Sequence, residues 1–162
     1  MISAPVLVLY LVLGICWMAA IVDIRTMTIP NYFPLAVIAI FVLVAPWSFG
    51  SLAGFAWQFA AFALAFIGGF VIYMTGTMGG GDVKLFAALG FWMLLENFII
   101  WIFLVTFSGL IITFGQIIFL SFKLKSKEEI SLKTAIKKVL KKEMPYGPAI
   151  ALGTTLTYLL LP

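Results

Sequence analysis

The 162-residue chain contains no histidine, a single cysteine and few charged side chains. Without histidine, it lacks the Ser–His, Cys–His and H-E-x-x-H arrangements that serine, cysteine and zinc proteases use. The one cysteine, Cys16, lies in an apolar run, so it forms neither an intramolecular disulfide nor a zinc-binding cysteine cluster. We interpret Cys16 as a small buried side chain, and we expect neither a metal nor a cofactor.

The shortage of charge defines the class of protein. Charged residues make up 10% of the chain and hydrophobic residues 64%, and the mean hydropathy is +1.21. Soluble domains are roughly 45–50% apolar and about 25% charged. The composition therefore predicts one integral membrane domain over residues 1–162, with no separate soluble domain. No basic residue precedes the first apolar run, which favours a retained first helix over a cleaved signal peptide.

Apolar runs along the chain predict its helices. One span of the ~30 Å hydrocarbon core needs about 20 residues, so we expect an all-α, polytopic membrane bundle of about six transmembrane helices. Pro46 is expected to end the second helix. Gly68 and Gly69 are expected to let the backbone of a neighbouring helix approach the third helix closely. The fourth is short, so we expect it to tilt or to begin below the surface. The predicted helices cover approximately residues 6–22, 32–44, 52–74, 82–95, 98–122 and 146–161.

The basic residues predict the orientation in the membrane. They are Arg25, Lys84 and eight lysines between Lys123 and Lys142, all in or beside the first, third and fifth connections. The second and fourth connections have no basic residue, and the fourth contains Glu96. The positive-inside rule therefore places the odd-numbered connections in the cytoplasm and both termini outside. We predict a multi-pass protein of the cell (inner) membrane.

The segment from Lys123 to Lys142 has the pattern of one cytoplasmic interfacial amphipathic helix. Ser126 and Glu129 have the spacing of a capping box. We expect the helix to bind anionic membrane lipid, with docking of a protein partner as the alternative. Neutralising its lysines should weaken lipid association more than any chemistry, and nothing indicates nucleic-acid binding. Its apolar residues, at helical spacing on one face, are Leu132, Ile136, Val139 and Leu140.

Only two aspartates occur in the chain, Asp23 and Asp82, each where an apolar segment meets a short polar turn. The predicted orientation puts both near the cytoplasmic face. Each also has an ordinary structural interpretation, Asp82 as a helix N-cap and Asp23 as a cap or a partner of Arg25. Because carboxylates at membrane depth are costly to keep, two on the same side favour a function.

Two carboxylates held close together tend to share one proton. One can then act as a base on water while the other donates a proton or hydrogen bond to a carbonyl group, as in an aspartic protease. A Ser–Lys pair is conceivable, but no serine lies near Lys84 in sequence. Two other classes stay open: a proton- or cation-coupled transporter that uses Asp23 and Asp82, and a structural subunit with two capping aspartates.

Three motifs carry a resemblance to a known family. Asp23 begins D-I-R-T-M-T-I-P-N, G-G-G-D-V-K-L (79–85) opens the fourth predicted helix, and P-Y-G-P-A (145–149) opens the last. In this order, and with the hydropathy pattern, they resemble the type IV prepilin peptidases, the GxGD membrane aspartic proteases, over nearly the whole chain. The resemblance implies that Asp23 and Asp82 are catalytic. It implies a prepilin or pilin-like precursor, cut at the cytoplasmic membrane edge, commonly after glycine and ahead of a hydrophobic helix.

One departure from the family pattern concerns a second activity. The larger bifunctional members also methylate the new N-terminus and carry a cytoplasmic N-terminal region with paired cysteines. This chain runs from its first helix into Asp23 and has only Cys16. It resembles the short branch that serves tight-adherence pili, which implies a peptidase without N-methyltransferase activity.

Several further residues are candidate supporting residues of the site. Glycines before Asp82 let the backbone turn sharply and a substrate approach, with a plain flexible connection as the alternative. Lys84 is expected to reach lipid phosphate or to tune the aspartates. Pro30 and Asn31 are expected to start the second helix. Tyr146 lies at interface height, where a site-facing role is the alternative to an ordinary aromatic belt. The candidates are Gly79, Gly81, Lys84, Asn31, Pro145, Tyr146 and Gly147.

Overall fold

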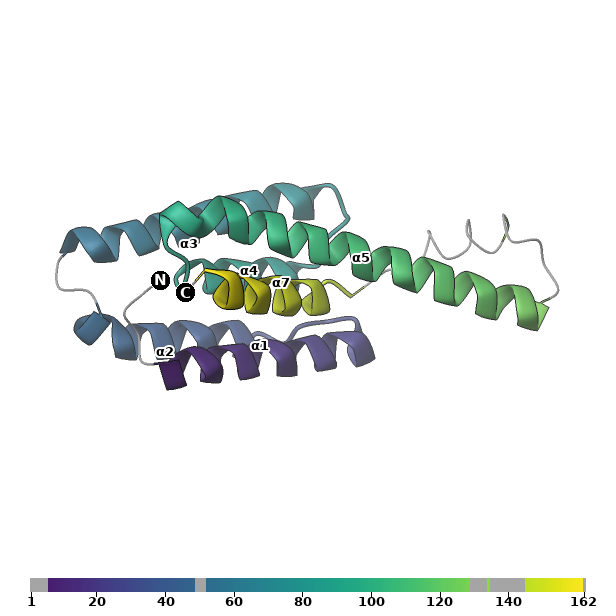
Figure 1. Cartoon of the computed structure of the whole chain (residues 1–162), viewed down its shortest axis with the longest axis horizontal. Helices are drawn as coiled ribbons and strands as arrows, with labels where there is room; N and C mark the ends of the chain where they lie inside the picture. The colour runs from purple at the N-terminus through teal and green to yellow at the C-terminus, as the bar shows by residue number, and fades with distance from the viewer. Residues whose placement is uncertain (1–5, 49–51, 129–133, 135–144, 162) are drawn as a thin grey trace.

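A computed structural model describes residues 6–48, 52–128, 134 and 145–161 (Figure 1). Among these residues the secondary structure is helical, with no strand, so the predicted all-α fold is confirmed. The helices are α1 (Val6–Thr26), α2 (Tyr32–Ser48), α3 (Leu52–Met74), α4 (Gly80–Gly90), α5 (Leu95–Glu128) and α7 (Gly147–Leu160).

The helices differ in whether their length suffices to cross a membrane. α1, the part of α3 from Gly54 to Met74, and the part of α5 from Leu95 to Lys123 are long and apolar enough. α2 and α7 are shorter apolar helices. α4 has 11 residues, which span about 16 Å at about 1.5 Å per residue. The short fourth helix expected from the sequence is therefore present, and it does not cross the membrane by itself.

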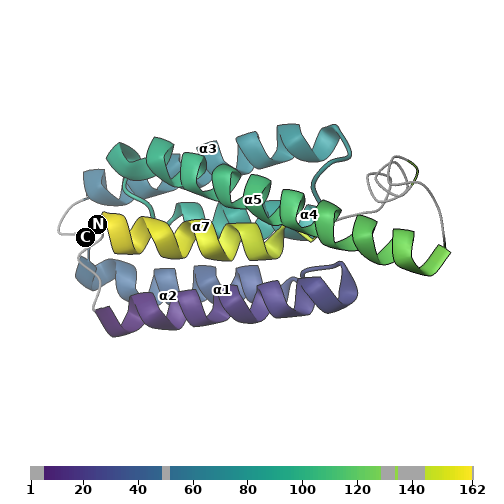
Figure 2. The ribbon, with the colours of Figure 1, turned by 45° about the vertical axis from the view of Figure 1, so that its right-hand side comes forward.

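The helices run roughly along one axis of the molecule. α4 and α7 lie in the middle, between the pair α1 and α2 and the pair α3 and α5 (Figures 1 and 2). The end of α1, the end of α3 and the starts of α4 and α7 lie at the same end of the bundle, on the right in Figure 1. α5 continues past that end. The topology therefore gathers the residues that follow α1 with those that open α4 and α7.

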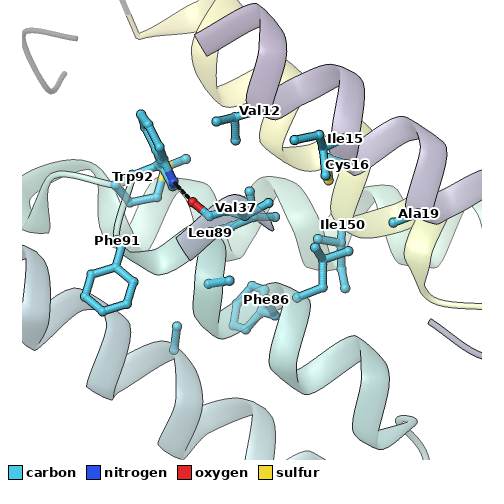
Figure 3. Packing of buried hydrophobic residues seen from close by; sticks show 14 of the residues in the cluster. Val12, Ile15, Cys16, Ala19, Val37, Phe86, Leu89, Phe91, Trp92 and Ile150 are labelled. Atoms are coloured by element: carbon cyan, nitrogen blue, oxygen red, sulfur yellow. Dashed lines mark hydrogen bonds between the residues drawn. The ribbon is translucent and has the colours of Figure 1, made fainter. Parts of the chain in front are cut away.

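The core is centred between α1, α2, α4 and α7, and α3 and α5 also contribute buried residues to it. Figure 3 shows part of it, including Cys16 of α1, Leu89 of α4 and Ile150 of α7, all of them buried. The indole N–H of Trp92 donates to the Val37 carbonyl of α2 at 3.3 Å. Burial of Cys16 agrees with its interpretation as a small apolar side chain.

Glycine lets α3 and α4 pack closely. A Cβ added to Gly69 would lie 3.2 Å from Val83 Cγ1, and one added to Gly90 would lie 2.9 Å from the Ala61 carbonyl oxygen. Gly68 has nothing within 4 Å of an added Cβ. Of the predicted Gly68–Gly69 pair, only Gly69 serves close helix packing.

Several predicted helix ends were wrong. α1 continues to Thr26 rather than residue 22, and α4 ends at Gly90 rather than residue 95. α2 continues through Pro46 to Ser48, because proline in the last turn removes only one hydrogen bond and few residues follow it. α5 continues through Lys123 to Glu128, since no glycine or proline interrupts the chain there. Ser126 therefore lies inside α5 rather than at a helix start. The remainder of the predicted surface helix, apart from Thr134, lies outside the described residues.

A buried turn fixes the far end of α4. The side-chain amide nitrogen of Gln58, when it faces this turn, donates to the backbone carbonyls of Phe91 at 2.9 Å and Met93 at 2.7 Å. The Tyr158 hydroxyl donates to the Trp92 carbonyl at 3.3 Å. Irregular backbone inside a membrane is tolerated only where such partners satisfy it. α4 is thus anchored at the end opposite Asp82.

Candidate active site

Asp23 lies near the end of α1 and is 2% exposed. Its Oδ2 accepts a hydrogen bond of 2.8 Å from the backbone N–H of Gly147, the first residue of α7. The first N–H groups of a helix lack partners within it, and the helix dipole favours a negative charge there. Asp23 therefore caps α7 from a different helix.

Only glycine fits at position 147. An added Cβ would lie 2.9 Å from Asp23 Oδ2, 3.0 Å from Asp23 Cβ and 3.2 Å from the Cα atom of Ala20. The Cα atom belongs to the backbone of α1 and cannot rotate away. Gly147 thus allows α7 to approach the Asp23 carboxylate, which gives this predicted supporting residue a direct contact with the candidate pair.

Asp82 is the third residue of α4 and is 7% exposed. Its Oδ2 accepts a hydrogen bond of 3.1 Å from the N–H of Gly79, which occupies the N-cap position. Asp82 was expected at the N-cap position itself, and it lies three residues after it. Its carboxylate nevertheless caps the start of α4 by accepting the Gly79 N–H. Asp82 Oδ1 is buried and has no hydrogen-bond partner within the described ranges. A buried, unpartnered oxygen is costly, so its persistence points to an interaction made with another molecule.

The two aspartates influence each other electrostatically. The pKa of Asp82, on the non-spanning helix α4, is raised to about 7. Burial is the larger cause and the negative charge of Asp23 the second, while the hydrogen bond from Gly79 acts in the opposite direction. This shift favours the protonated form of Asp82 near neutral pH. In the described part of the chain, no three His, Cys, Asp or Glu side chains gather as metal ligands.

Within the glycine turn, the three positions differ. A Cβ on Gly79 would lie 2.9 Å from Asp82 Oδ2, and one on Gly81 would lie 2.6 Å from the Ile29 carbonyl oxygen. A Cβ on Gly80 would meet only the ring of Tyr73, at an ordinary 3.7 Å. The backbone contact therefore requires glycine at position 81. A Cβ at position 79 would displace the Asp82 carboxylate, and one at position 80 would displace nothing. The Ile29 contact was not foreseen, because no local sequence pattern signals it.

Lys84 and Asn31 contact each other. Lys84 Nζ donates to Asn31 Oδ1 at 2.9 Å, and both side chains are exposed. Asn31 directly precedes α2, and its carbonyl accepts the N–H of Leu35. The sequence predicted that Lys84 reaches a phosphate or tunes the aspartates, whereas in the structure its ammonium group binds Asn31.

Pro145 and Tyr146 lie just before α7, as predicted. Tyr146 occupies the N-cap position, and its carbonyl accepts the N–H groups of Ala149 and Ile150. Both residues are partly exposed. Their described contacts help to start α7, and only Gly147 of this motif bonds to a candidate catalytic aspartate.

Comparison with known proteins points to a family. The profile of the type IV leader peptidase family matches residues 10–114. The chain belongs to the type IV leader peptidase family. The matched range of this leader peptidase includes Asp23, Asn31, Asp82 and Lys84 and ends before α7. No curated protein and no solved structure matched the chain. Family membership supports a peptidase that acts on prepilin-type substrates, and the apolar helices support a multi-pass membrane protein.

Proposed function

We propose that this leader peptidase is an aspartic endopeptidase in which Asp23 and Asp82 are the catalytic pair. One observation carries the proposal: Asp82 has a buried carboxylate oxygen without a partner, on a side chain whose pKa responds to the charge of Asp23. Perturbed carboxyl groups that interact with one another are typical of acid–base sites. The proposed substrate is a prepilin or pilin-like precursor with a hydrophobic helix after the cleavage site.

The environments of the two carboxyl groups suggest their roles. Asp82 carries the shared proton, because burial and the charge of Asp23 favour its neutral form. Asp23 is the carboxylate, since the N–H of Gly147 donates to it at the positive end of α7. The Gly147 hydrogen bond also fixes the direction in which Asp23 points.

Hydrolysis then proceeds without a covalent intermediate. Asp23 accepts a proton from a water molecule, whose oxygen attacks the scissile carbonyl carbon, while Asp82 donates its proton to the carbonyl oxygen. The tetrahedral intermediate collapses by breaking its C–N bond. The nitrogen leaves with the proton held by Asp23, and the other fragment ends in a new carboxyl group. Asp82 regains its proton from the collapsing intermediate.

We also propose that the site faces the cytoplasm and that both termini face outward. Arg25 and Lys84 lie at the same end of the bundle as the aspartates, and α5 carries Lys123 toward that end, whereas Glu96 opens α5 at the other end. This distribution supports the predicted orientation. Anionic-lipid binding by residues 123–142 stays a prediction. Peptidase activity without N-methylation also stays a prediction.

The test is cleavage of a purified pilin-like precursor by the wild type, Asp23→Asn and Asp82→Asn in proteoliposomes. We expect each variant to lose at least about 10³-fold in kcat, as removal of one member of a catalytic unit does. Glu96→Gln makes the same change of carboxylate to amide at the opposite end and should keep full activity. Near wild-type turnover by either Asn variant would refute the assignment. Proton or cation flux through the same proteoliposomes, lost in both Asn variants, would favour the transporter alternative instead.

A further inference from the structure

The loop between α1 and α2 is attached to α4, near its start, by a side-chain contact. Lys84 Nζ donates to Asn31 Oδ1 at 2.9 Å across 53 positions of sequence. Between residues 82 and 90 of α4, Lys84 alone is exposed, while every other side chain is buried. Its position on the helix therefore directs the ammonium group away from the core and toward the loop. We call this contact the Asn31–Lys84 latch.

A backbone contact lies beside the latch. Gly81 packs against Ile29 so tightly that an added Cβ would lie 2.6 Å from the Ile29 carbonyl oxygen and 3.1 Å from its nitrogen. Residues 29 and 31 of the loop are thus both held on α4, within one turn of Asp82. Two attachments so close together fix the direction of the loop as well as its distance from the helix.

The loop begins at Met27, one helical turn after Asp23. The N–H of Met27 donates to the Asp23 carbonyl at 2.8 Å, and Met27 has a φ of 54°, in the left-handed region that a methionine rarely adopts. Such a conformation persists only where surrounding contacts hold it. The contacts of the loop with α4 supply part of that constraint.

Direct packing does little to relate the two aspartates. α1 packs mainly against α7 and α2, whereas α4 packs mainly against α3 and α2. Helix α2 packs against both, and the α1–α2 loop adds a connection at the end of the bundle where the two aspartates lie. A shift of about 1 Å between catalytic groups can cost about 100-fold in rate, so this connection matters for chemistry.

We propose that Asn31 and Lys84 are positioning residues whose hydrogen bond holds the α1–α2 loop on α4 and so sets the separation of the Asp23 and Asp82 carboxylates. The inference rests on the proposed function of those two aspartates. It assigns Lys84 a role through Asn31 rather than through direct contact with substrate, lipid or either carboxylate.

The test compares the wild type with Asn31→Ala, Lys84→Met and the double variant in proteoliposomes. We expect each single change to lower kcat about ten-fold and to leave KM within about two-fold, because positioning acts on the chemical step. The double variant should be no slower than either single one, since both remove the same contact. Lys84→Arg, which retains a donor, should recover most of the activity. Lys123→Met removes an exposed lysine of α5 and is the matched control.

Hydrogen exchange of the α1–α2 loop gives a readout independent of catalysis. Peptides covering residues 27–31 should exchange faster in Asn31→Ala and Lys84→Met than in the wild type or Lys123→Met. The latch would be overturned if the single variants kept the wild-type kcat, or if the double variant were about 100-fold slower than the wild type. Unchanged hydrogen exchange of the loop in the single variants would also overturn it. Activity retained by Asp23→Asn or Asp82→Asn would instead overturn the proposed function, and the exchange data would still decide whether the latch holds the loop.

Discussion

Asp23 and Asp82 accept hydrogen bonds from residues at very different distances along the chain. Asp82 accepts its hydrogen bond from Gly79, three positions away, whereas Asp23 accepts its bond from Gly147, 124 positions away. The first is a local capping contact that α4 makes as it forms. The second exists only once α7 has packed against α1. One half of the candidate site is therefore encoded locally, and the other depends on the assembled bundle.

The largest effect outside the aspartates is expected at Gly147. Gly147→Ala places a Cβ against Asp23 Oδ2 and the α1 backbone at Ala20, so it must displace the carboxylate or α7. We predict a loss of about 100-fold in kcat, measured by precursor cleavage. Gly109→Ala is the control, because its Cβ would meet only Ala149 Cβ at an ordinary 3.5 Å. Equal activity of the two variants would show that Asp23 does not depend on α7.

The glycine turn tests the Asp82 half. Gly81→Ala forces the Ile29 backbone away from α4, and we predict a loss of about thirty-fold in kcat. Gly80→Ala, one position away, has only the Tyr73 ring within reach and should cleave the precursor at nearly the wild-type rate. A reversed order of the two variants would contradict the close contact at Ile29.

The pH dependence distinguishes the two carboxyl groups further. Because the pKa of Asp82 is raised to about 7, this group is protonated below that pH and ionised above it. If Asp82 is the acid, kcat/KM should fall as pH rises through about 7, approaching about ten-fold per pH unit. A pH–rate profile measured with Glu96→Gln alongside checks this, and a fall beginning near pH 4, the ordinary carboxyl range, would count against it.

The smallest effect on chemistry is expected at the far end of α4. Gln58→Leu leaves the buried carbonyls of Phe91 and Met93 without their donor, which should cost about 1–3 kcal/mol of stability. Thermal unfolding in detergent should show a lower Tm than for Gln116→Leu, a change at a partly exposed glutamine of α5. Since the contact lies away from Asp82, kcat at low temperature should change little. A large loss of kcat without a loss of stability would contradict this separation.

The sequence predicted most of what local patterns encode. Apolar runs identified the membrane helices, and the rarity of aspartate, together with the motifs around it, identified Asp23 and Asp82 as candidates. The Gly147 contact with Asp23 and the Lys84 contact with Asn31 were not predicted, because each joins residues more than 50 positions apart. The errors at helix ends have a different, local origin. Pro46 was expected to stop a helix that its neighbours continue, and α5 meets no glycine or proline at Lys123.

The most direct test of the central claim is intact-mass measurement of a pilin-like precursor co-expressed with the wild type, Asp23→Asn, Asp82→Asn or the double variant. If the two carboxyl groups act as one catalytic unit, only the wild type should release the leader, and the three variants should be indistinguishable. Leader removal at the wild-type level by any variant that lacks one of the two carboxylates would contradict the account.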